Sequence, residues 1–185
     1  MRFVALLLFL AFTACQSTPE PQTRTQYRLS TASAEATAVA ASGIRVRVAA
    51  YLNQPGMIVE DADGGLHPAH YHQWSEPLDQ ALEQLIGAEL SREASEQNSG
   101  NDVLVFVERL HGTMGGQALL SATYGLESEG KTDSATRFSS STLLKQAGYS
   151  ALVDAHRVLV RQLAAEISTF LSAAGKPEEP EATDS

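Results

Sequence analysis

The fold is decided by the stretch DVLVFVERLHGTMGGQALLSATYGL, which occupies residues 102–126. Its first part, Asp102–Leu110, contains five consecutive apolar residues, and such a run is typical of a strand in the middle of a sheet. Its last part alternates with period two, which predicts a half-buried strand. The apolar positions of that part are Ala118, Leu120, Ala122, Tyr124 and Leu126. The glycine-rich loop Gly112–Gly116 connects the two parts, so we predict an antiparallel hairpin.

Further strands are predicted on both sides of this hairpin. A third antiparallel strand, Ala135–Thr142, follows the turn Glu127–Asp133. Upstream, Ile44–Val48 alternates between aliphatic residues and arginine. Three other short strands are predicted at Gln26–Ser30, Met57–Glu60 and Leu66–Gln73. The last two flank Asp61–Gly65, whose residue types favour turns, and Pro68 places the start of the last strand at an edge or a bulge.

Two long helices complete the pattern. The first has Ser75 as its expected N-cap and Pro77 in its first turn, and it ends within Glu96–Gly100. Its apolar stripe consists of Leu78, Ala81, Leu82, Leu85, Ile86 and Leu90. The second helix, Tyr149–Ala174, has its stripe at Leu152, Ala155, Leu159, Leu163, Ile167 and Phe170. This order predicts the α+β class: a two-layer sandwich of a mostly antiparallel sheet with two long helices on one face.

The amino-terminal end has the features of a bacterial lipoprotein signal. Arg2 supplies a positive charge, and the apolar run Phe3–Phe12 is shorter than the ~20 residues that span a bilayer. Two small residues separate this run from Cys15, the only cysteine. We therefore predict a signal peptide over residues 1–14 and acylation of Cys15, and Gln16 is typical of lipoproteins sorted to the outer membrane of Gram-negative bacteria. The alternatives are a secreted protein with an incidental cysteine and a buried free thiol.

The composition limits what the predicted domain, residues 26–174, can do. Residues 15–25 form a flexible tether after the acylated cysteine, the Ala/Ser/Thr-rich stretch Ala32–Ser42 is a loop, and residues 175–185 form a disordered acidic tail. With a single cysteine the domain has no internal disulfide. A formal net charge of −9 argues against nucleic acid as a partner and against lying flat on anionic lipid.

Four segments of the sequence together resemble the PqiC/YmbA family of ABC-type transport auxiliary lipoproteins. In chain order, they are Ile44–Val48 running on to Tyr51-Leu52, then Ile58-Val59, Gln73-Trp74-Ser75-Glu76-Pro77-Leu78, and Gly148–Ala155 at the start of the last helix. The lipobox-like site at Cys15 is also similar. The resemblance covers Tyr27–Leu171, which is nearly all of the predicted domain.

The resemblance implies a function as well as a fold. The fold would be like that of the amino-terminal domain of TolB. The protein itself would be an outer-membrane lipoprotein that faces the periplasm, and a ring-shaped homo-oligomer is a further implication of the resemblance. Its partners would be an MCE-domain protein and the permease and ATPase of an ABC transporter, which together move phospholipid between membranes. A member of such a family is a docking component without catalytic activity.

Four residues are candidates for a partner-docking surface. Tyr51, Leu52 and Met57 surround a Pro-Gly turn, and we expect them to be exposed there. The alternative is that this segment forms a bulge at the domain edge. Trp74, the only tryptophan, is either an interface anchor or a staple that packs just before the first helix, and the sequence favours the staple.

Other candidate sites are weaker. His67, His70 and His72 could share a zinc ion, but the sequence places no fourth ligand near them, so we predict exposed edge histidines and no metal or other cofactor. His111–Gly116 is rich in glycine but links two strands, which favours a hairpin turn over a phosphate loop. No serine lies in a Gly-x-Ser-x-Gly elbow, and we predict no catalytic residues.

The function also has an alternative at this point. A lipid-anchored domain of this class would also suit a regulator or assembly factor of another envelope machine, such as a cell-wall synthase activator or a secretion component.

Overall fold

The computed structural model describes residues 23–30, 43–93, 102–128 and 131–174. The predicted signal peptide, the lipidated cysteine, most of the tether, the 32–42 loop, the end of the first helix within Glu96–Gly100 and the acidic tail lie outside the described residues. Within the described ranges, no helix is long and apolar enough to cross a membrane.

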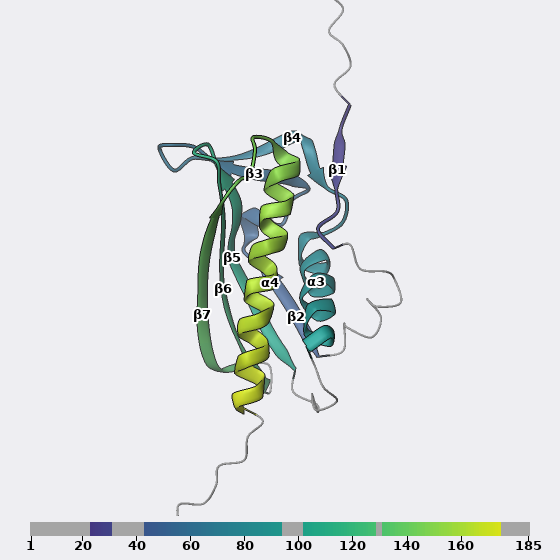
Figure 1. Cartoon of the computed structure of the whole chain (residues 1–185), viewed down its shortest axis with the longest axis vertical. Coiled ribbons are helices and arrows are strands. Elements are labelled where there is room, and N and C mark those ends of the chain that lie inside the picture. The colour runs from purple at the N-terminus through teal and green to yellow at the C-terminus, as the bar shows by residue number, and fades with distance from the viewer. Residues whose placement is uncertain (1–22, 31–42, 94–101, 129–130, 175–185) are drawn as a thin grey trace, which may run out of the picture.

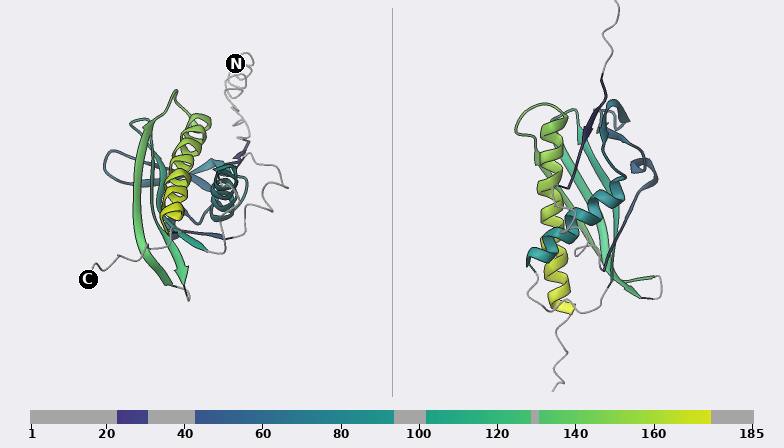
Figure 2. Two further views of the ribbon diagram at one scale, coloured as in Figure 1. Left: turned by 60° about the horizontal axis from the view of Figure 1, so that its bottom comes forward. Right: turned by 90° about the vertical axis from the view of Figure 1, so that its right-hand side faces the viewer.

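The described elements follow the predicted order of strands, helix, strands, helix (Figure 1). They are β1 (Thr25–Tyr27), β2 (Ile44–Val48), the short 3-10 helix η2 (Ala50–Leu52), β3 (Gly56–Glu60), β4 (Leu66–Trp74), α3 (Leu78–Glu93), β5 (Val103–Thr113), β6 (Gln117–Ser128), β7 (Lys131–Leu143) and α4 (Tyr149–Ala174). In the described part of the chain, seven strands form one sheet, and both helices lie on the same side of it (Figure 2). The predicted two-layer α+β sandwich is confirmed.

The strand β5 is central, as its apolar run predicts. On one side it pairs antiparallel with β6, which in turn pairs antiparallel with β7. Its other side is shared by two parallel neighbours, β2 along Val103–Val107 and β3 at Gly112 and Thr113. The helix η2 lies between these two neighbours in the chain. Most paired residues of the sheet lie in antiparallel pairs, as predicted. The sequence does not predict the two parallel pairs of β5 or the parallel pair of β1 with β4.

Alternation places the core between the sheet and the helices. Val103, Val105 and Val107 of β5 have no exposed surface. The predicted apolar stripe of α3 is entirely buried, and that of α4 is buried except for Phe170, which packs against the core while partly exposed. Each fully buried aliphatic side chain contributes roughly 1.5–3 kcal/mol, so this layer contact is the main source of stability.

A bulge in β5 keeps its second half in phase with the core. Val107 pairs with Ala122 and Arg109 with Ser121, which leaves Glu108 as the extra residue. Without this extra residue, strict alternation would turn Arg109 toward the helices. With it, Leu110 reaches the core instead and is 2% exposed.

Pro68 lies at an open edge, as predicted. The strand β1 pairs with β4 only at His72, Gln73 and Trp74, so the first half of β4 has a neighbour, β3, on one side alone. A proline in that half therefore removes no ladder hydrogen bond on the open side.

The start of α3 differs from the prediction. The helix begins at Leu78, and the carbonyl of Pro77 accepts the first helical hydrogen bond from Ala81 N at 3.0 Å. Ser75 is therefore not the N-cap. Its backbone N–H instead donates to Tyr27 O at 2.8 Å, which fixes β1 to the entry of the helix.

Candidate functional site

The predicted docking segment lies mostly inside the domain. Leu52 is 2% exposed, Met57 is fully buried and Tyr51 is half-buried. The prediction that they are exposed is wrong, because η2 turns its apolar side chain inward, where it joins the core. The register of β3 against β4 shifts between Gly56 and Ile58, at the end of the segment for which a bulge was the alternative prediction.

Tyr51 has a structural role at the edge of the core. Its hydroxyl donates a hydrogen bond to Glu108 O at 3.1 Å, and its ring meets that of His111 edge-on. Burial raises the pKa of the Tyr51 phenol, an effect that Arg109 partly opposes. The phenol therefore stays protonated and holds the bulged residue of β5 in place.

Trp74 is an interior residue. It is 6% exposed and belongs to the same core cluster as Leu78 and Leu82 of α3. Its ring lies 6.0 Å from that of His156 in α4. The interpretation as an interface anchor is therefore wrong, because Trp74 packs inside the domain, and its packing as a staple against the first turn of α3 stays a prediction.

The three histidines near β4 have separate surroundings. His67 Nε2 lies 2.6 Å from Asp61 Oδ2, and this contact lowers the pKa of the Asp61 carboxyl. His72 stacks on Tyr149 at a ring separation of 4.0 Å and is within hydrogen-bond distance of the Tyr27 hydroxyl, whereas His70 is exposed. Among the residues described, no group of three His, Cys, Asp or Glu side chains could hold a metal ion.

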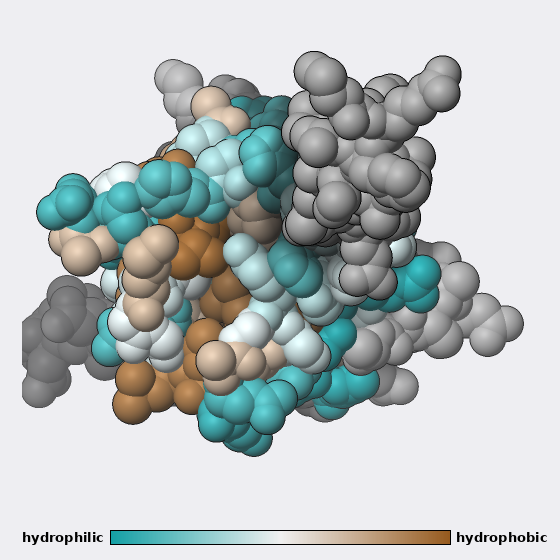
Figure 3. Space-filling model, turned by 90° about the horizontal axis from the view of Figure 1, so that it is seen from above, coloured by the Kyte–Doolittle hydropathy of each residue, from teal (hydrophilic) through white to brown (hydrophobic). Residues whose placement is uncertain are grey.

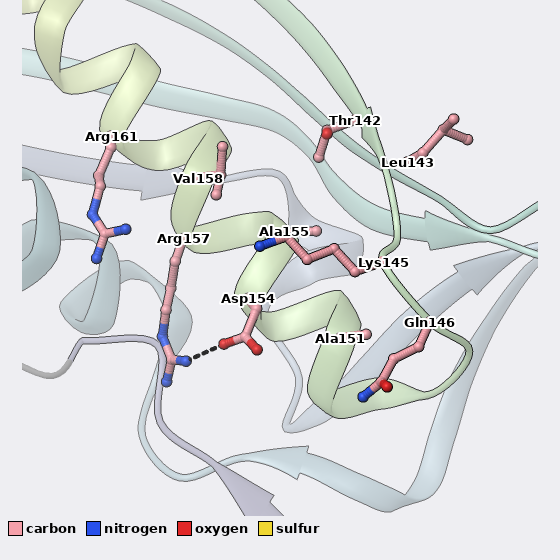
Figure 4. A pocket seen from close by; sticks show the side chains of 10 residues that line it. All are labelled: Thr142, Leu143, Lys145, Gln146, Ala151, Asp154, Ala155, Arg157, Val158 and Arg161. Atoms are coloured by element: carbon pink, nitrogen blue, oxygen red, sulfur yellow. Dashed lines mark hydrogen bonds and ion pairs between the residues drawn. The ribbon is translucent and has the colours of Figure 1, made fainter.

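A groove of about 570 Å³ runs beside the first half of α4 (Figure 4). One wall is the end of β7 and the loop after it, and the other is the helix itself. The lining residues are Thr142, Leu143, Lys145, Gln146, Ala151, Asp154, Ala155, Arg157, Val158 and Arg161. Leu143 and Val158 are exposed apolar side chains at this groove.

Two of the three cations of the groove hold the fold together. Arg157 donates to the carbonyl oxygens of Arg28 and Leu29 at 2.7 and 3.1 Å and forms an ion pair with Asp154 at 2.6 Å. Arg161 donates to Glu89 of α3 at 3.1 Å. Lys145 forms no hydrogen bond or ion pair with the described residues. The groove can therefore bind an apolar or weakly anionic group, but it pairs no nucleophile with a base.

Comparison with known proteins identifies the family. The family of ABC-type transport auxiliary lipoprotein components matches residues 27–168. The chain belongs to this family. No curated protein matches its sequence.

The fold of the auxiliary lipoprotein is similar to solved structures. The structure of an uncharacterized protein has a TM-score of 0.66 at 21% identity and covers 80% of this chain and 99% of its own. A protein from Xanthomonas campestris of the DUF330 family has a TM-score of 0.56 at 17% identity and covers 71% of this chain and 82% of its own. At these identities the likeness extends to the fold alone.

The sheet face away from the helices carries a row of exposed and partly exposed side chains. Pairing places Arg47, Phe106, Thr123 and Arg137 in one row across four strands. Phe106 is 42% exposed, and Arg47 forms no hydrogen bond or ion pair with the described residues. Arg45, in the next row, is paired with Glu127 at 2.6 Å.

This row combines local and non-local information. The alternation of Ile44–Val48 predicts that Arg45 and Arg47 lie on one face of a strand. It does not predict which residues of other strands lie beside them. The row itself depends on the register of β2 with β5, and no local pattern sets that register. An exposed aromatic ring between two arginines in a protein with net charge −9 is typical of a surface for an acidic partner.

His156 is a buried titratable group that the sequence analysis did not single out. It is 1% exposed, and neither ring nitrogen forms a hydrogen bond with the described residues. Burial lowers the pKa of His156 to about 4, while the backbone of His111 acts in the opposite direction and the charge of its ring adds to the lowering. At neutral pH the imidazole is therefore uncharged. It is part of the packing between α4 and Trp74.

Proposed function

We propose that this auxiliary lipoprotein is a docking subunit of an MCE/ABC-type system that moves phospholipid between membranes. In this proposal, acyl chains on Cys15 hold it at the outer membrane of a Gram-negative bacterium, and its domain faces the periplasm. Its partners are the MCE-domain protein and, through it, the permease and ATPase of the ABC transporter. Its role is positional and requires no catalysis.

The family match over residues 27–168 carries this proposal, because it assigns the folded domain to an auxiliary component of ABC-type transport. The lipobox-like sequence before Cys15 supports the anchor. On the sheet face away from the helices, Arg47, Phe106, Thr123 and Arg137 form one row, and residues of these types suit binding to a protein partner.

The surface proposed to dock the partner is the row of Arg47, Phe106, Thr123 and Arg137. The Arg137 side chain is 75% exposed and its contact with Glu108 is long, at 3.8 Å, while Arg47 forms no hydrogen bond or ion pair with any described residue. Both guanidinium groups are therefore proposed to bind carboxylates of a partner. Phe106 adds apolar contact between them. We propose an acidic surface of the MCE-domain protein as the occupant.

Two variants test the anchor and the docking face separately. Cys15→Ala is expected to leave a folded protein that no longer fractionates with membranes, and retention in the membrane fraction would refute the anchor. The double variant Arg47→Glu/Arg137→Glu is expected to keep the anchor but to lose crosslinking to the MCE-domain protein. Arg92→Glu is the matched control, because Arg92 is similarly exposed (67%) but lies on α3.

The crosslinked partners also decide between the two candidate functions. Recovery of an MCE-domain protein with its permease and ATPase supports lipid transport. Recovery of a cell-wall synthase or a secretin would instead support a regulator or assembly factor of another envelope machine.

A further inference from the structure

One end of the domain gathers three connections of the chain. Met114 N, in the turn between β5 and β6, donates to Glu60 O at 2.9 Å, at the start of the turn between β3 and β4. Leu144 N, in the loop between β7 and α4, donates to Gly116 O at 2.8 Å. These bonds join the three connections into one surface, at the upper end in Figure 1, which we call the tether end.

The tether end is unusually apolar for a set of turns. Met114 is 72% exposed, Leu143 is 69% exposed and Leu66 is 42% exposed. Behind them is a hollow of about 250 Å³ whose walls include Leu144 and Tyr149. Figure 3 looks onto this end and shows apolar residues gathered at its centre and along one side, between polar residues. Side chains that project this far from tight turns add little to the core.

The described chain begins at the same end. Thr25 of β1 pairs with His72 of β4, and the ring of His72 stacks on Tyr149, which lines the apolar hollow. From Cys15 to Thr23 there are eight peptide steps, so the chain between them spans at most about 28 Å. The opposite end of α4 lies about 39 Å away along its 26 residues. An anchor on Cys15 therefore keeps the tether end nearest to the bilayer.

From this arrangement we infer that the tether end rests on the lipid surface, with Met114, Leu143 and Leu66 inserted among the headgroups and first methylenes. The inference rests on the proposed anchoring of Cys15.

The contact is apolar and not electrostatic. Glu60, Asp61 and Asp63 lie at the same end as Lys145, so the end carries no cationic excess that would select anionic lipid. It is therefore expected to form on zwitterionic membranes and to persist at high salt. Its orientation leaves the row of Arg47 and Arg137 facing sideways, accessible to a partner.

Site-specific labelling of the lipidated full chain in phosphatidylcholine vesicles tests the inference. Acylation blocks Cys15, so Met114→Cys provides one free thiol for the environment-sensitive fluorophore NBD, and Leu143→Cys provides an independent second position. Ser172→Cys, at the opposite end of α4, is the matched control. NBD at 114 and 143 is expected to emit at shorter wavelength and to be quenched at least twofold by nitroxide-labelled lipid, also in 1 M NaCl. NBD at 172 is expected to show neither effect.

The outcomes separate this inference from the proposed function. If the protein sediments with the vesicles but NBD at 114 and 143 behaves as at 172, the anchor stands and the inference is wrong. If 1 M NaCl abolishes the quenching, the contact is electrostatic and the inference is also wrong. If the lipidated protein does not sediment with vesicles, both the anchor and the inference fail.

Discussion

Replacing His156 by leucine is expected to remove the part of the acid sensitivity of the domain that comes from this buried imidazole. The imidazole of His156 projects from α4 toward Trp74 and forms no hydrogen bond with the described residues. Burial lowers the pKa of His156 from 6.5 to about 4. Below pH 6.5 the unfolded chain takes up a proton at this residue while the folded domain does not. Protons therefore favour unfolding, and the loss of stability develops as the pH falls from about 6.5 and is complete below about 4.

The magnitude follows from the same two values. A tenfold difference in proton affinity corresponds to about 1.4 kcal/mol, so the full effect of His156 is about 3 kcal/mol. Between pH 7.5 and 4.5, the free energy of unfolding of the wild type should fall by roughly 2 to 3 kcal/mol more than that of His156→Leu. At pH 7.5 the variant should be the more stable by about 1–3 kcal/mol, because leucine leaves no buried nitrogen without a partner.

Urea unfolding at a series of pH values measures this difference directly. His70→Leu is the matched control, because it makes the same substitution at an exposed histidine outside the core. All other titrating groups are common to the wild type and both variants, so they cancel in the comparison. Equal losses of stability for the wild type and His156→Leu between pH 7.5 and 4.5 would show that His156 is charged or solvated in the folded domain, contrary to this reasoning.

Three further variants test the packing. Gly56→Ala should destabilise the domain by about 1–3 kcal/mol in urea unfolding, because the new Cβ would lie 2.8 Å from the backbone oxygen of Ala69, whereas Gly115→Ala meets only ordinary contacts and should change little. Leu163→Ala, at a fully buried position of α4, should lower the free energy of unfolding by about 2–5 kcal/mol, and a smaller loss would mean that the helix layer repacks. Arg157→Lys should leave global stability within about 1 kcal/mol but speed amide hydrogen exchange in the segment after β1, since one ammonium cannot reproduce the planar fork. Unchanged exchange there would refute the role assigned to the guanidinium.

The parts of the fold that the sequence predicts are those governed by local period. The stripe of α3 and the alternation of β6 depend on residues a few positions apart, and their apolar side chains are buried as predicted except that of Leu126, which is partly exposed. The same reasoning would have placed His156 in the core, because it lies four residues after Leu152 and three before Leu159 on the buried face of α4. His156 was not predicted as a core residue because histidine is polar, although its position in the helix fits the buried face.

The parts that the sequence does not predict depend on contacts between distant segments. The bulge at Glu108 keeps Arg109 on the sheet face away from the helices. The sequence does not predict it, because the bulge is required only where helices cover the other face of the sheet. The parallel register of β2 with β5 joins segments about 60 residues apart, and it creates the row of Arg47 and Phe106. Likewise, Met57 follows a Pro-Gly pair typical of an exposed turn, yet the chain enters β3 there and the side chain is buried.

A tether is useful only if the segment that carries it stays attached to the domain. The strand β1 has three residues, and its ladder pairs only with His72–Trp74 at the edge of the sheet, which is little to resist a pull from the membrane. Leu29, 1% exposed in the core, lies two residues after the strand, and Arg157 in the first half of α4 donates to the carbonyls of Arg28 and Leu29 at 2.7 and 3.1 Å. With the proposed anchor on Cys15, a pull would act on β1 first, because β1 lies between Cys15 and Leu29 in the chain. Beyond β1, the burial of Leu29 and the hydrogen bonds from Arg157 would resist the pull, so Arg157 attaches the tethered segment to α4, the longest described element.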